Sequence, residues 1–513
     1  MRLRVIPAIA LLLLPLIACK APGLGNGPAA AETPGAPGTA PPAAAGKEWP
    51  LWGGTPERNQ ANPAVKGIPA EWDAEKGTNI LWSAELGSRS YGNPVVAGGR
   101  IFVGTNNEKP HNPKVDGDRG ILLCLRQSDG AFLWQAVHEK LESGRANDWP
   151  EEGICSSPCV EGNRVYYVSN RCELVCADVE GLLDGKNDGP FRDEKHHDPT
   201  DADFIWVLDM MEELSVFPHN LASSCPMVVG DLVFLLTGNG VDESHITIPQ
   251  PDAPSFIAVN KTTGKVVWED HSPGGNILHG QWSSPAWGVI GGQPQVVFPG
   301  GDGWLYGFEP LTGKPLWKFD CNPKDSVYDL GGKGTRNNII ATPVITGDRV
   351  FLGVGEDPEH GEGVGHLYAI DPSKAAASGT PGSAGPIDIT VTGRAWHLGD
   401  KDFRRTISSV AVHEGLVYAA NLSGILVCLD EKTGRPCWTH DLLSAVWGSP
   451  TVIDGKVYLG NEDGDVLVFQ AGREKKLLAK NPMPSAVYGT PVAAHGVLYV
   501  ADRTTLFAIE ERP

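Results

Sequence analysis

The amino-acid sequence predicts an all-β protein: an eight-bladed β-propeller of four-stranded antiparallel blades, closed by an N-terminal strand that pairs with the C-terminal blade. Three observations lead to this prediction. A hairpin signature with one internal spacing occurs four times, a second signature opens eight successive units, and one strand near the N-terminus has no hairpin partner. Such repeats are typical of arrays in which each unit covers its neighbour.

The hairpin signature is an apolar strand, a turn that ends in glycine, and a tryptophan four residues after that glycine. Glycine readily takes the positive φ that such a turn requires, and tryptophan is a large apolar anchor for the second strand. The four copies are Gly130–Trp134, Gly264–Trp268, Gly313–Trp317 and Gly434–Trp438. We expect Trp206, Trp396 and Leu477 to fill the tryptophan position in less regular units.

The second signature is a short polar residue followed by proline and a valine-rich strand, and it opens each unit. The prolines are Pro94, Pro158, Pro226, Pro285, Pro343, Pro450 and Pro491, with Val410 at this position in the remaining copy. Two more strands and the tryptophan strand complete a unit. Since a lone sheet of this size is only marginally stable, eight in series favour a closed ring.

The last unit, residues 487–513, contains only three strands. The strand Asn79–Leu86 carries a tryptophan but has no hairpin before it. We therefore expect this strand to pair beside Thr505–Glu510 and complete the ring. Closure of this kind removes open sheet edges, which otherwise promote aggregation.

Residues 1–47 are predicted to lie outside the propeller, which would span residues 48–513 as a single domain. A charged start followed by an apolar run indicates a signal peptide of residues 1–19. Its last four residues, Leu-Ile-Ala-Cys, resemble the bacterial lipoprotein box, in which the cysteine, here Cys19, carries the lipid. The alternative is a plain signal peptide with an incidental cysteine. Residues 20–47 are rich in alanine, proline and glycine, which predicts a disordered tether.

Charge and cysteine usage narrow the choice of partners and compartment. The formal net charge of −20 disfavours nucleic acid as a partner. Three of the nine cysteines that follow Cys19 occupy a column of small residues on the third strand of each unit: Cys124, Cys176 and Cys428. A disulfide among Cys155, Cys159, Cys172 and Cys176 is left open, because the predicted compartment is oxidising.

Long loops are predicted to gather on one face of the ring, where residues ahead of the first strands point to the axis. Aromatic, amide and arginine side chains at one mouth suit a planar or anionic ligand. The candidates are His219, Asn220, His279, Gln281, Trp282, Arg336, Asn337, Arg404, Arg405, Trp447 and Tyr488. The alternative is that these residues cap strand ends and leave a water-filled channel mouth.

A weaker prediction concerns metal binding by the loop that contains Asp357, His360 and Glu362. The segment Asp242–His245 would join it from the neighbouring side. Carboxylates and imidazoles can surround a metal ion, but no standard ligand spacing is matched. A solvated acidic loop is the competing interpretation.

The repeat resembles that of the pyrroloquinoline-quinone (PQQ) repeat family, in which a strand and an Asp-x-x-Thr-Gly turn precede tryptophan, as in Asp430–Trp438. The resemblance covers residue 49 to the C-terminus and implies an eight-bladed ring. The family includes quinoprotein alcohol dehydrogenases, which hold PQQ and calcium on the axis, and a cofactor-free outer-membrane assembly lipoprotein. The adjacent cysteines and the Cys-x-x-Cys-His motif of the dehydrogenases are absent from this sequence.

These observations favour a lipoprotein propeller that is anchored to the outer membrane, faces the periplasm, and acts as a binding or assembly scaffold in the cell envelope. An envelope protein is then the expected partner, with a small ligand as a second option and no cofactor required. The alternative is a PQQ- or metal-dependent oxidoreductase with its site at the axial mouth. A carbohydrate-active enzyme built on paired carboxylates is a third interpretation.

Overall fold

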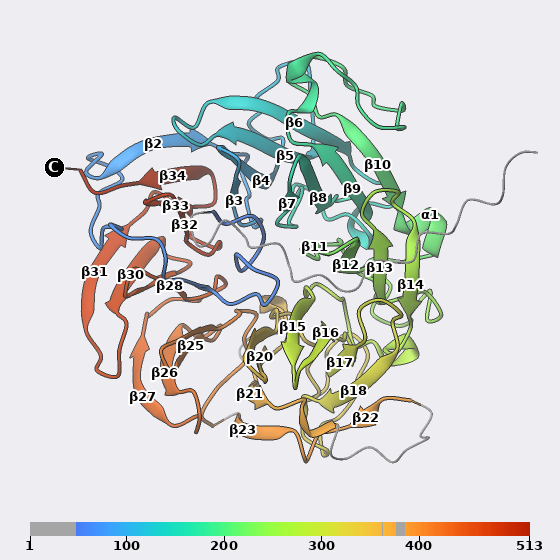
Figure 1. Ribbon diagram of the computed structural model, residues 1–513, viewed down its shortest axis with the longest axis vertical. Coiled ribbons are helices and arrows are strands. Elements are labelled where there is room, and N and C mark those ends of the chain that lie inside the picture. Colours follow the sequence, from blue (N-terminus) through green and yellow to red (C-terminus); the bar gives the residue numbers. More distant parts are fainter. Residues whose placement is uncertain (1–47, 362, 376–384, 400, 513) are drawn as a thin grey trace, which may run out of the picture. The chain divides into compact units, whose positions relative to one another are not determined.

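The computed structural model describes residues 48–361, 363–375, 385–399 and 401–512. The predicted signal peptide, Cys19, the tether and Glu362 lie outside these residues. Within the described ranges the strands form eight sheets, which are set around a common axis as the blades of a propeller (Figure 1). This arrangement confirms the predicted fold class.

Each blade contains four antiparallel strands, which run in chain order from the axis outward except that β2 is the outer strand of the last blade. The first four blades are β3 (Val95–Ala97), β4 (Arg100–Asn106), β5 (Arg119–Arg126) and β6 (Phe132–Glu139); β7 (Cys159–Glu161), β8 (Arg164–Val168), β9 (Glu173–Asp178) and β10 (Phe204–Asp209); β11 (Met227–Val229), β12 (Leu232–Leu236), β13 (Phe256–Asn260) and β14 (Val266–Asp270); and β15 (Ala286–Ile290), β16 (Gln293–Pro299), β17 (Trp304–Phe308) and β18 (Pro315–Asp320).

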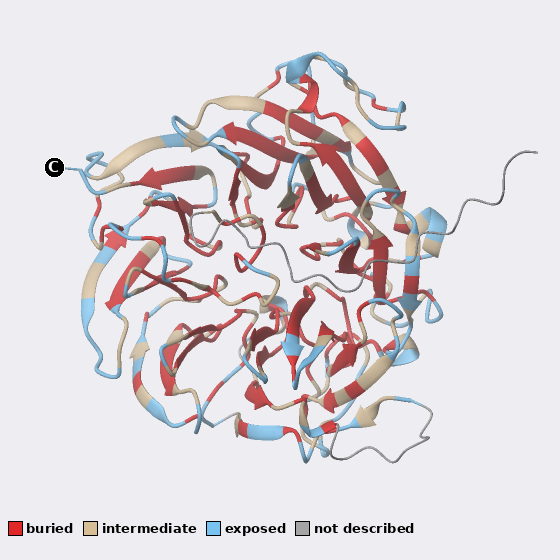
Figure 2. Cartoon of the chain, in the orientation of Figure 1, coloured by how far each residue is buried: buried red, intermediate tan, exposed pale blue. Residues whose placement is uncertain are grey.

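The remaining blades follow the same plan. They are β19 (Val344–Thr346), β20 (Arg349–Val354), β21 (His366–Ile370) and β23 (Arg394–Leu398); β24 (Ala411–His413), β25 (Leu416–Ala420), β26 (Ile425–Asp430) and β27 (Pro436–Asp441); β28 (Thr451–Ile453), β29 (Lys456–Gly460), β30 (Asp465–Gln470) and β31 (Leu477–Pro482); and β32 (Val492–Ala494), β33 (Val497–Ala501), β34 (Thr505–Ile509) and β2 (Ile80–Glu85). The second and third strands are mostly buried between blades, whereas the fourth strands alternate with exposed residues (Figure 2).

The ring is closed by β2, which pairs antiparallel with β34 as the outer strand of the last blade. Trp82 of β2 faces Ala508 of β34 in this pairing. The strand therefore takes the tryptophan position that the C-terminal unit lacks. The predicted closure is confirmed.

Tryptophans on the fourth strands face small residues on the third strands. Cys428 lies opposite Trp438, and Gly307 lies opposite Trp317. A Cβ atom on Gly307 would stand 2.2 Å from the Trp317 ring. The column of small residues therefore makes room for the indole, as predicted for the cysteines it contains.

The indoles also join each blade to the next. Trp82 packs against the turn glycine Gly130 of the first blade, where an added Cβ would lie 2.5 Å from the ring. The Trp82 Nε1 donates to the Gln127 carbonyl in the same turn at 3.1 Å. The turn glycine is therefore needed for close approach as well as for its positive φ of 71°.

The tryptophan position is filled as expected by Trp206 and Trp396, but the prediction for Leu477 was wrong. Ala479 lies at the tryptophan register of β31, whereas Leu477 lies two residues earlier and is 45% exposed. Trp72, from the segment that precedes β2, packs against this blade instead, and its Nε1 lies 3.2 Å from the Met483 sulfur. A residue distant in sequence thus supplies the missing apolar volume.

Side chains of the residue before proline link the innermost strands around the axis. A backbone N–H of one blade donates to the side chain of this residue in the next blade, for example from Asn93 to Ser157 Oγ at 2.9 Å and from Ser449 to Thr490 Oγ1 at 2.8 Å. The link back to the start runs from the Thr490 N–H to Asn93 Oδ1 at 2.6 Å. This requirement for a short acceptor explains the polar residue of the second signature.

The segment Glu48–Asn62 crosses the ring and contacts the innermost strands of seven blades and, in the third, the residues just before β11. Its backbone bonds reach Val96 in the first blade, Trp287 in the fourth and, through β1 (Ala61–Asn62), β28 in the seventh. Arg58 lies in the middle of this segment and is fully buried. We call residues 48–62 the plug; its place at the centre of the ring can be followed in Figure 1.

Two insertions extend the outer edge of the preceding blade. Asp201 bridges in parallel to Gln135 of β6, and β22 (Ile387–Asp388) pairs in parallel with β18. Both contacts cover backbone groups of an otherwise exposed edge strand. The helix α1 (Met210–Leu214) follows β10 directly. Among the described residues, no helix combines the length and apolar character that crossing a membrane requires.

The nine cysteines of the described residues are all free thiols. The disulfide that the sequence left open among Cys155, Cys159, Cys172 and Cys176 is therefore not formed. Burial raises the pKa of Cys159 to about 11 and that of Cys176 to about 12, which keeps both in the thiol form at neutral pH.

Candidate functional site

The axial mouth is a cavity of about 450 Å³ on the face that carries the long loops. Its walls come from several blades and include four aromatic side chains, Tyr91, Trp149, Trp282 and Trp447. The principal lining residues are Arg89, Tyr91, Trp149, Glu152, His279, Trp282, Asp357 and Trp447. Long loops on a rigid scaffold commonly carry function, so this cavity is the first place to look for a binding site.

Several predicted mouth residues meet at this cavity. Asn220, His279, Trp282 and Trp447 line it. Tyr488 stands beside it, with its ring centroid 4.7 Å from that of Trp447. His219 lies behind the wall and is fully buried, with its ring centroid 4.4 Å from that of His279.

Other predicted residues are engaged away from the cavity. Arg336 donates to Asp320 at the end of β18 at 2.8 Å, on the outer side of its blade. Gln281 donates to the Asn239 carbonyl and accepts from a backbone N–H, so it joins two blades. The backbone of Arg404 bridges to Val364.

Arg405 and Asn337 form a polar layer beneath the mouth. The Arg405 Nε donates to Asn337 Oδ1 at 3.2 Å, and its Nη1 donates to the His360 carbonyl at 2.8 Å. Both side chains are more than nine-tenths buried. They hold the loop that carries His360 against the blade rather than facing a ligand.

Three histidines converge at the edge of the mouth. The Nε2 atom of His245 lies 3.1 Å from that of His219 and 3.1 Å from that of His279. His219 precedes the first strand of the third blade, His279 precedes that of the fourth, and His245 comes from the loop between β12 and β13. Burial, and after it the neighbouring imidazole of His279, lowers the pKa of His219 to about 3, so His219 is neutral at physiological pH.

Asp357 orients two of the imidazoles around the cluster. Its Oδ2 accepts from His279 Nδ1 at 3.0 Å and from His360 Nδ1 at 2.8 Å. Burial alone would raise the pKa of Asp357, but the hydrogen bonds from the two histidines outweigh burial and hold this pKa well below its usual range. The carboxylate is therefore ionised at neutral pH and fixes both rings.

Glu356 is fully buried next to Asp357. Its Oε1 accepts from the Asn338 N–H at 3.2 Å, whereas its Oε2 has no hydrogen-bond partner among the described residues. Burial raises the pKa of Glu356 to about 7. Glu356 opens the loop that the sequence offers as a weak metal candidate, two residues after the end of β20.

Close backbone approach brings the loops of the cluster together. A Cβ atom on Gly240 would lie 2.7 Å from His219 Cβ, and one on Gly331 would lie 2.6 Å from His245 Cβ. His245 itself has a φ of +57°, which is unusual for a residue with a side chain. The predicted approach of Asp242–His245 to the loop of His360 is thus seen, but the nearest imidazoles to His245 are those of His219, in the same blade, and His279, in the next.

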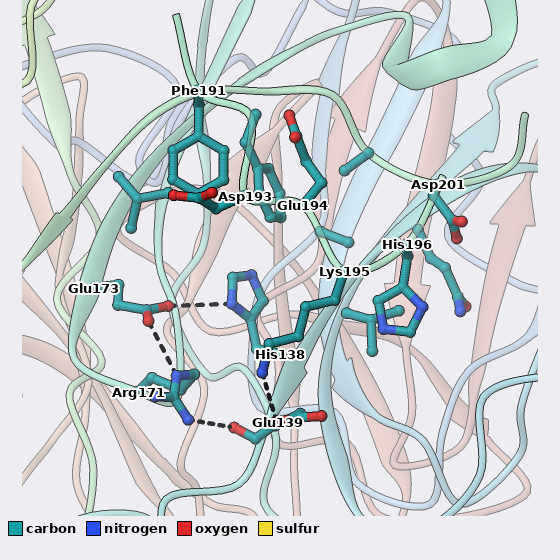
Figure 3. A pocket seen from close by; sticks show the side chains of 16 residues that line it. His138, Glu139, Arg171, Glu173, Phe191, Asp193, Glu194, Lys195, His196 and Asp201 are labelled. Carbon is teal, nitrogen blue, oxygen red and sulfur yellow. Dashed lines mark hydrogen bonds and ion pairs between the residues drawn. The ribbon is translucent and has the colours of Figure 1, made fainter. Parts of the chain in front are cut away.

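A second cavity, of about 180 Å³, lies at the outer edge of the first two blades beneath the insertion of residues 178–203 (Figure 3). Figure 3 shows five of its charged side chains linked with one another: Glu173 pairs with His138 and Arg171, and Glu139 pairs with Lys195. His138 is further held by the Tyr167 hydroxyl at 2.9 Å. We interpret this cavity as an internal ion-pair network that holds the insertion in place.

This network predicts a specific acid sensitivity. Burial would raise the pKa of Glu173, but its hydrogen bond to His138 and its pairing with Arg171 lower it from 4.5 to about 2. A pKa that is depressed on folding stabilises the protein above pH 4.5, and this stabilisation, about 3 kcal/mol, is lost as the pH falls towards 2. Urea unfolding of the wild type and of Glu173→Gln between pH 6 and pH 3 measures it. We expect the difference between the two to shrink with falling pH; a constant difference would contradict the pairing.

The sequence of this ring matches a known protein family. The model of the family described as outer membrane protein assembly factor BamB matches residues 198–357 and 258–512. Together these matches cover more than half of the chain. The chain belongs to this family. Its PQQ-type repeat is thereby established, in agreement with the resemblance that the hairpin signature indicated.

Solved structures similar to this member of the BamB family include both kinds of ring. BamB from Moraxella catarrhalis superposes with a TM-score of 0.54 at 13% identity, covering 84% of this chain and 99% of that one. A quinohemoprotein alcohol dehydrogenase, ADHIIG, from Pseudomonas putida HK5 superposes with a TM-score of 0.59 at 13% identity, covering 91% of this chain and 81% of that one. At such identities the likeness shows the fold alone.

A short stretch also resembles a curated enzyme. Over 58 residues the chain is 43% identical to a 1-butanol dehydrogenase (cytochrome c) of Thauera butanivorans, which is 10% of this chain and 8% of that protein. The chain therefore matches less than a tenth of that relative's length. A match of this length indicates a shared repeat and leaves the activity open.

The mouth offers few free oxygen ligands for PQQ held by calcium. Calcium prefers six to eight oxygen ligands, but the Asp357 carboxylate is occupied by His279, His360 and the Glu359 N–H. The neighbouring donors are imidazole nitrogens together with the Glu356 carboxylate. Arg89, which lines the cavity and would have to meet the quinone carboxylates, is already paired with Glu152.

Proposed function

We propose that this protein is a lipid-anchored propeller of the cell envelope that binds a partner protein through its axial mouth. The observation that carries the proposal is the aromatic cavity on the loop-bearing face. The family's description as an assembly factor supports a binding role, and the Leu-Ile-Ala-Cys sequence that ends at Cys19 supports the anchor. An outer-membrane, periplasm-facing location is part of this proposal.

The composition of the mouth supports protein binding in particular. Tyr91, Trp447 and Tyr488 form one aromatic group, with ring centroids between 4.7 and 5.9 Å apart. Aromatic residues dominate the energetic centres of protein interfaces, while charged residues are more common at the rim. Arg89, paired with Glu152, provides such a charge beside the aromatic group.

Replacing Trp447 by alanine should reduce capture of the partner from detergent-solubilised envelope by at least about tenfold, because a central aromatic contributes about 2 kcal/mol or more to binding. The matched control is Trp304→Ala. Trp304 is also half-buried but lies in β17, where Lys318 covers its ring. Equal capture by wild type and both variants would contradict binding at the mouth.

In the same full-length chain, Cys19→Ser should release the protein from the membrane fraction.

An oxidoreductase that uses PQQ at the same mouth is the second candidate. Its support is the aromatic wall formed by Trp282 and Trp447, which suits a planar ring. The test is to mix the purified protein with PQQ and calcium, separate them by gel filtration and record an absorbance spectrum. No retained chromophore at micromolar concentration would end this candidate.

A further inference from the structure

We propose that His219, His245 and His279 form a binding site for one divalent transition-metal ion, with zinc as the preferred occupant. This inference goes beyond the proposed scaffold role and does not depend on it. It concerns a cluster that a ring with a purely structural axis would not need.

The spacing of the three imidazoles matches shared coordination. Zinc binds histidine nitrogens at about 2.0–2.1 Å in tetrahedral geometry, which places two ligand nitrogens about 3.3 Å apart. The Nε2 atom of His245 lies 3.1 Å from that of each of the other two histidines. The three ligand atoms all lie within 4.8 Å of one another. Small shifts of the rings would therefore complete three metal–nitrogen bonds.

The tautomers leave lone pairs that face one another. His219 Nδ1 lies 2.9 Å from the Val241 carbonyl, and His279 Nδ1 lies 3.0 Å from the Asp357 carboxylate. Both partners only accept, so each Nδ1 must carry the hydrogen and each Nε2 presents a lone pair. A neutral His245 can donate its Nε2 hydrogen to only one of them. A metal ion satisfies all three nitrogens at once.

The supporting contacts are those that metal-bound histidines normally have. Such histidines usually donate their other ring nitrogen to a carboxylate or a backbone carbonyl, which fixes the ring and strengthens the ligand. His279 has the carboxylate and His219 has the carbonyl. Asp242 builds the third arm, because its Oδ1 accepts from the N–H groups of Ile246 and Thr247, next to His245.

The donor set selects the class of metal. Imidazole suits zinc, copper, iron and nickel, whereas calcium and magnesium prefer oxygen. Three protein ligands leave a fourth position of the tetrahedron for water or an anion, as in zinc sites that exchange their fourth ligand. His279 also lines the mouth, so we place this fourth position towards the mouth cavity.

A competing set of donors lies beside this one: His279, Glu356, Asp357 and His360 also fall within 4.8 Å of one another. Asp357 is less available to a metal, because its Oδ2 accepts from two histidines and its Oδ1 accepts from the Glu359 N–H. His360 Nε2 lies 2.8 Å from the Gly331 carbonyl, so both of its nitrogens are engaged. We therefore assign the ion to the three-histidine set.

The experiment uses the full-length protein, purified in detergent through a tag without histidine and stripped with a chelator. Zinc or cobalt is added alone, excess ion is removed by desalting, and bound metal is counted by mass spectrometry. We expect one equivalent of zinc and, with cobalt, the intense visible absorption of a tetrahedral site. Uptake below about 0.2 equivalents would overturn the proposal.

Substitutions locate the ion. His245→Ala should abolish stoichiometric uptake; this residue is half-buried on a loop, and circular dichroism checks the fold. Asp357→Asn should weaken zinc about 10–100-fold, as loss of a supporting contact does. His397→Ala is the matched control, because His397 lies 3.1 Å from His366 in a pair outside the cluster.

Two results would overturn the assignment. One is a His245→Ala protein that folds and still binds one equivalent of zinc. The other is loss of zinc in His360→Ala while His245→Ala retains it, which would move the ion to the carboxylate-containing set. If His245→Ala does not fold, His245→Gln, which keeps the side-chain volume, decides in its place by the same cobalt spectrum.

Discussion

Replacing Arg58 by methionine should lower the free energy of unfolding by about 3–5 kcal/mol. The guanidinium is fully buried in the plug, and it donates to the carbonyls of Trp52, Cys225 and Pro285, each at 2.8 Å. Methionine fills a similar volume but donates nothing, so buried carbonyls lose their partners at a cost of about 1–3 kcal/mol each. Although burial lowers the pKa of Arg58 to about 10, the group remains charged at neutral pH.

Urea unfolding followed by tryptophan fluorescence measures this effect. Arg58→Lys should give a smaller loss, since lysine keeps the charge but cannot reproduce the planar fork of donors. Arg126→Met is the control, because Arg126 is exposed and pairs only with Asp129 of its own turn. If Arg58→Met unfolds at the same urea concentration as this control, the plug does not hold the blades together.

Replacing Trp317 by alanine should cost about 3–5 kcal/mol. The side chain is 1% exposed, and its Nε1 donates to the Gln295 Oε1 at 2.7 Å, so the substitution leaves a large cavity and an unpaired amide oxygen. The backbone of Trp317 also pairs with β22, which leaves little freedom for the site to collapse.

Thermal unfolding compares this variant with Trp149→Ala. Trp149 is half-buried at the mouth, where Arg145 lies 4.2 Å from its ring centroid. Its truncation should cost less than about 1 kcal/mol, because it removes partly hydrated surface and creates no closed void. Equal shifts for the two variants would contradict the role of the indoles as inter-blade anchors.

The blades could be predicted because each one is specified locally. The turn glycine, the small residue of the third strand and the indole lie within one hairpin, as Gly307 and Trp317 do. Their spacing along the chain is therefore constant and can be recognised in the sequence. Closure could also be predicted, because β2 carries a tryptophan without its own hairpin. The error at Leu477 has the opposite cause: Trp72, which replaces the missing indole, lies some 400 residues away along the chain.

The candidate site was only partly predictable. His219, His279 and Trp282 were expected at the mouth because they precede first strands, and the structure brings them together. Arg336 also precedes a first strand, but its side chain turns away from the mouth and pairs with Asp320. The direction of a long side chain depends on which oppositely charged groups the fold places near it. The same dependence places the loop residue His245 between His219 of its own blade and His279 of the next.

By itself, the sequence determined the eight-bladed ring, its closure by β2 and the face on which the loops gather, because these follow from patterns repeated within each unit. Only the tertiary structure decided how Arg58 closes the axis, which thiols stay free and which imidazoles meet. Those contacts join residues that lie far apart in the chain. A ring brings segments of all eight blades to one axis, and no local sequence pattern indicates which of these segments will pair.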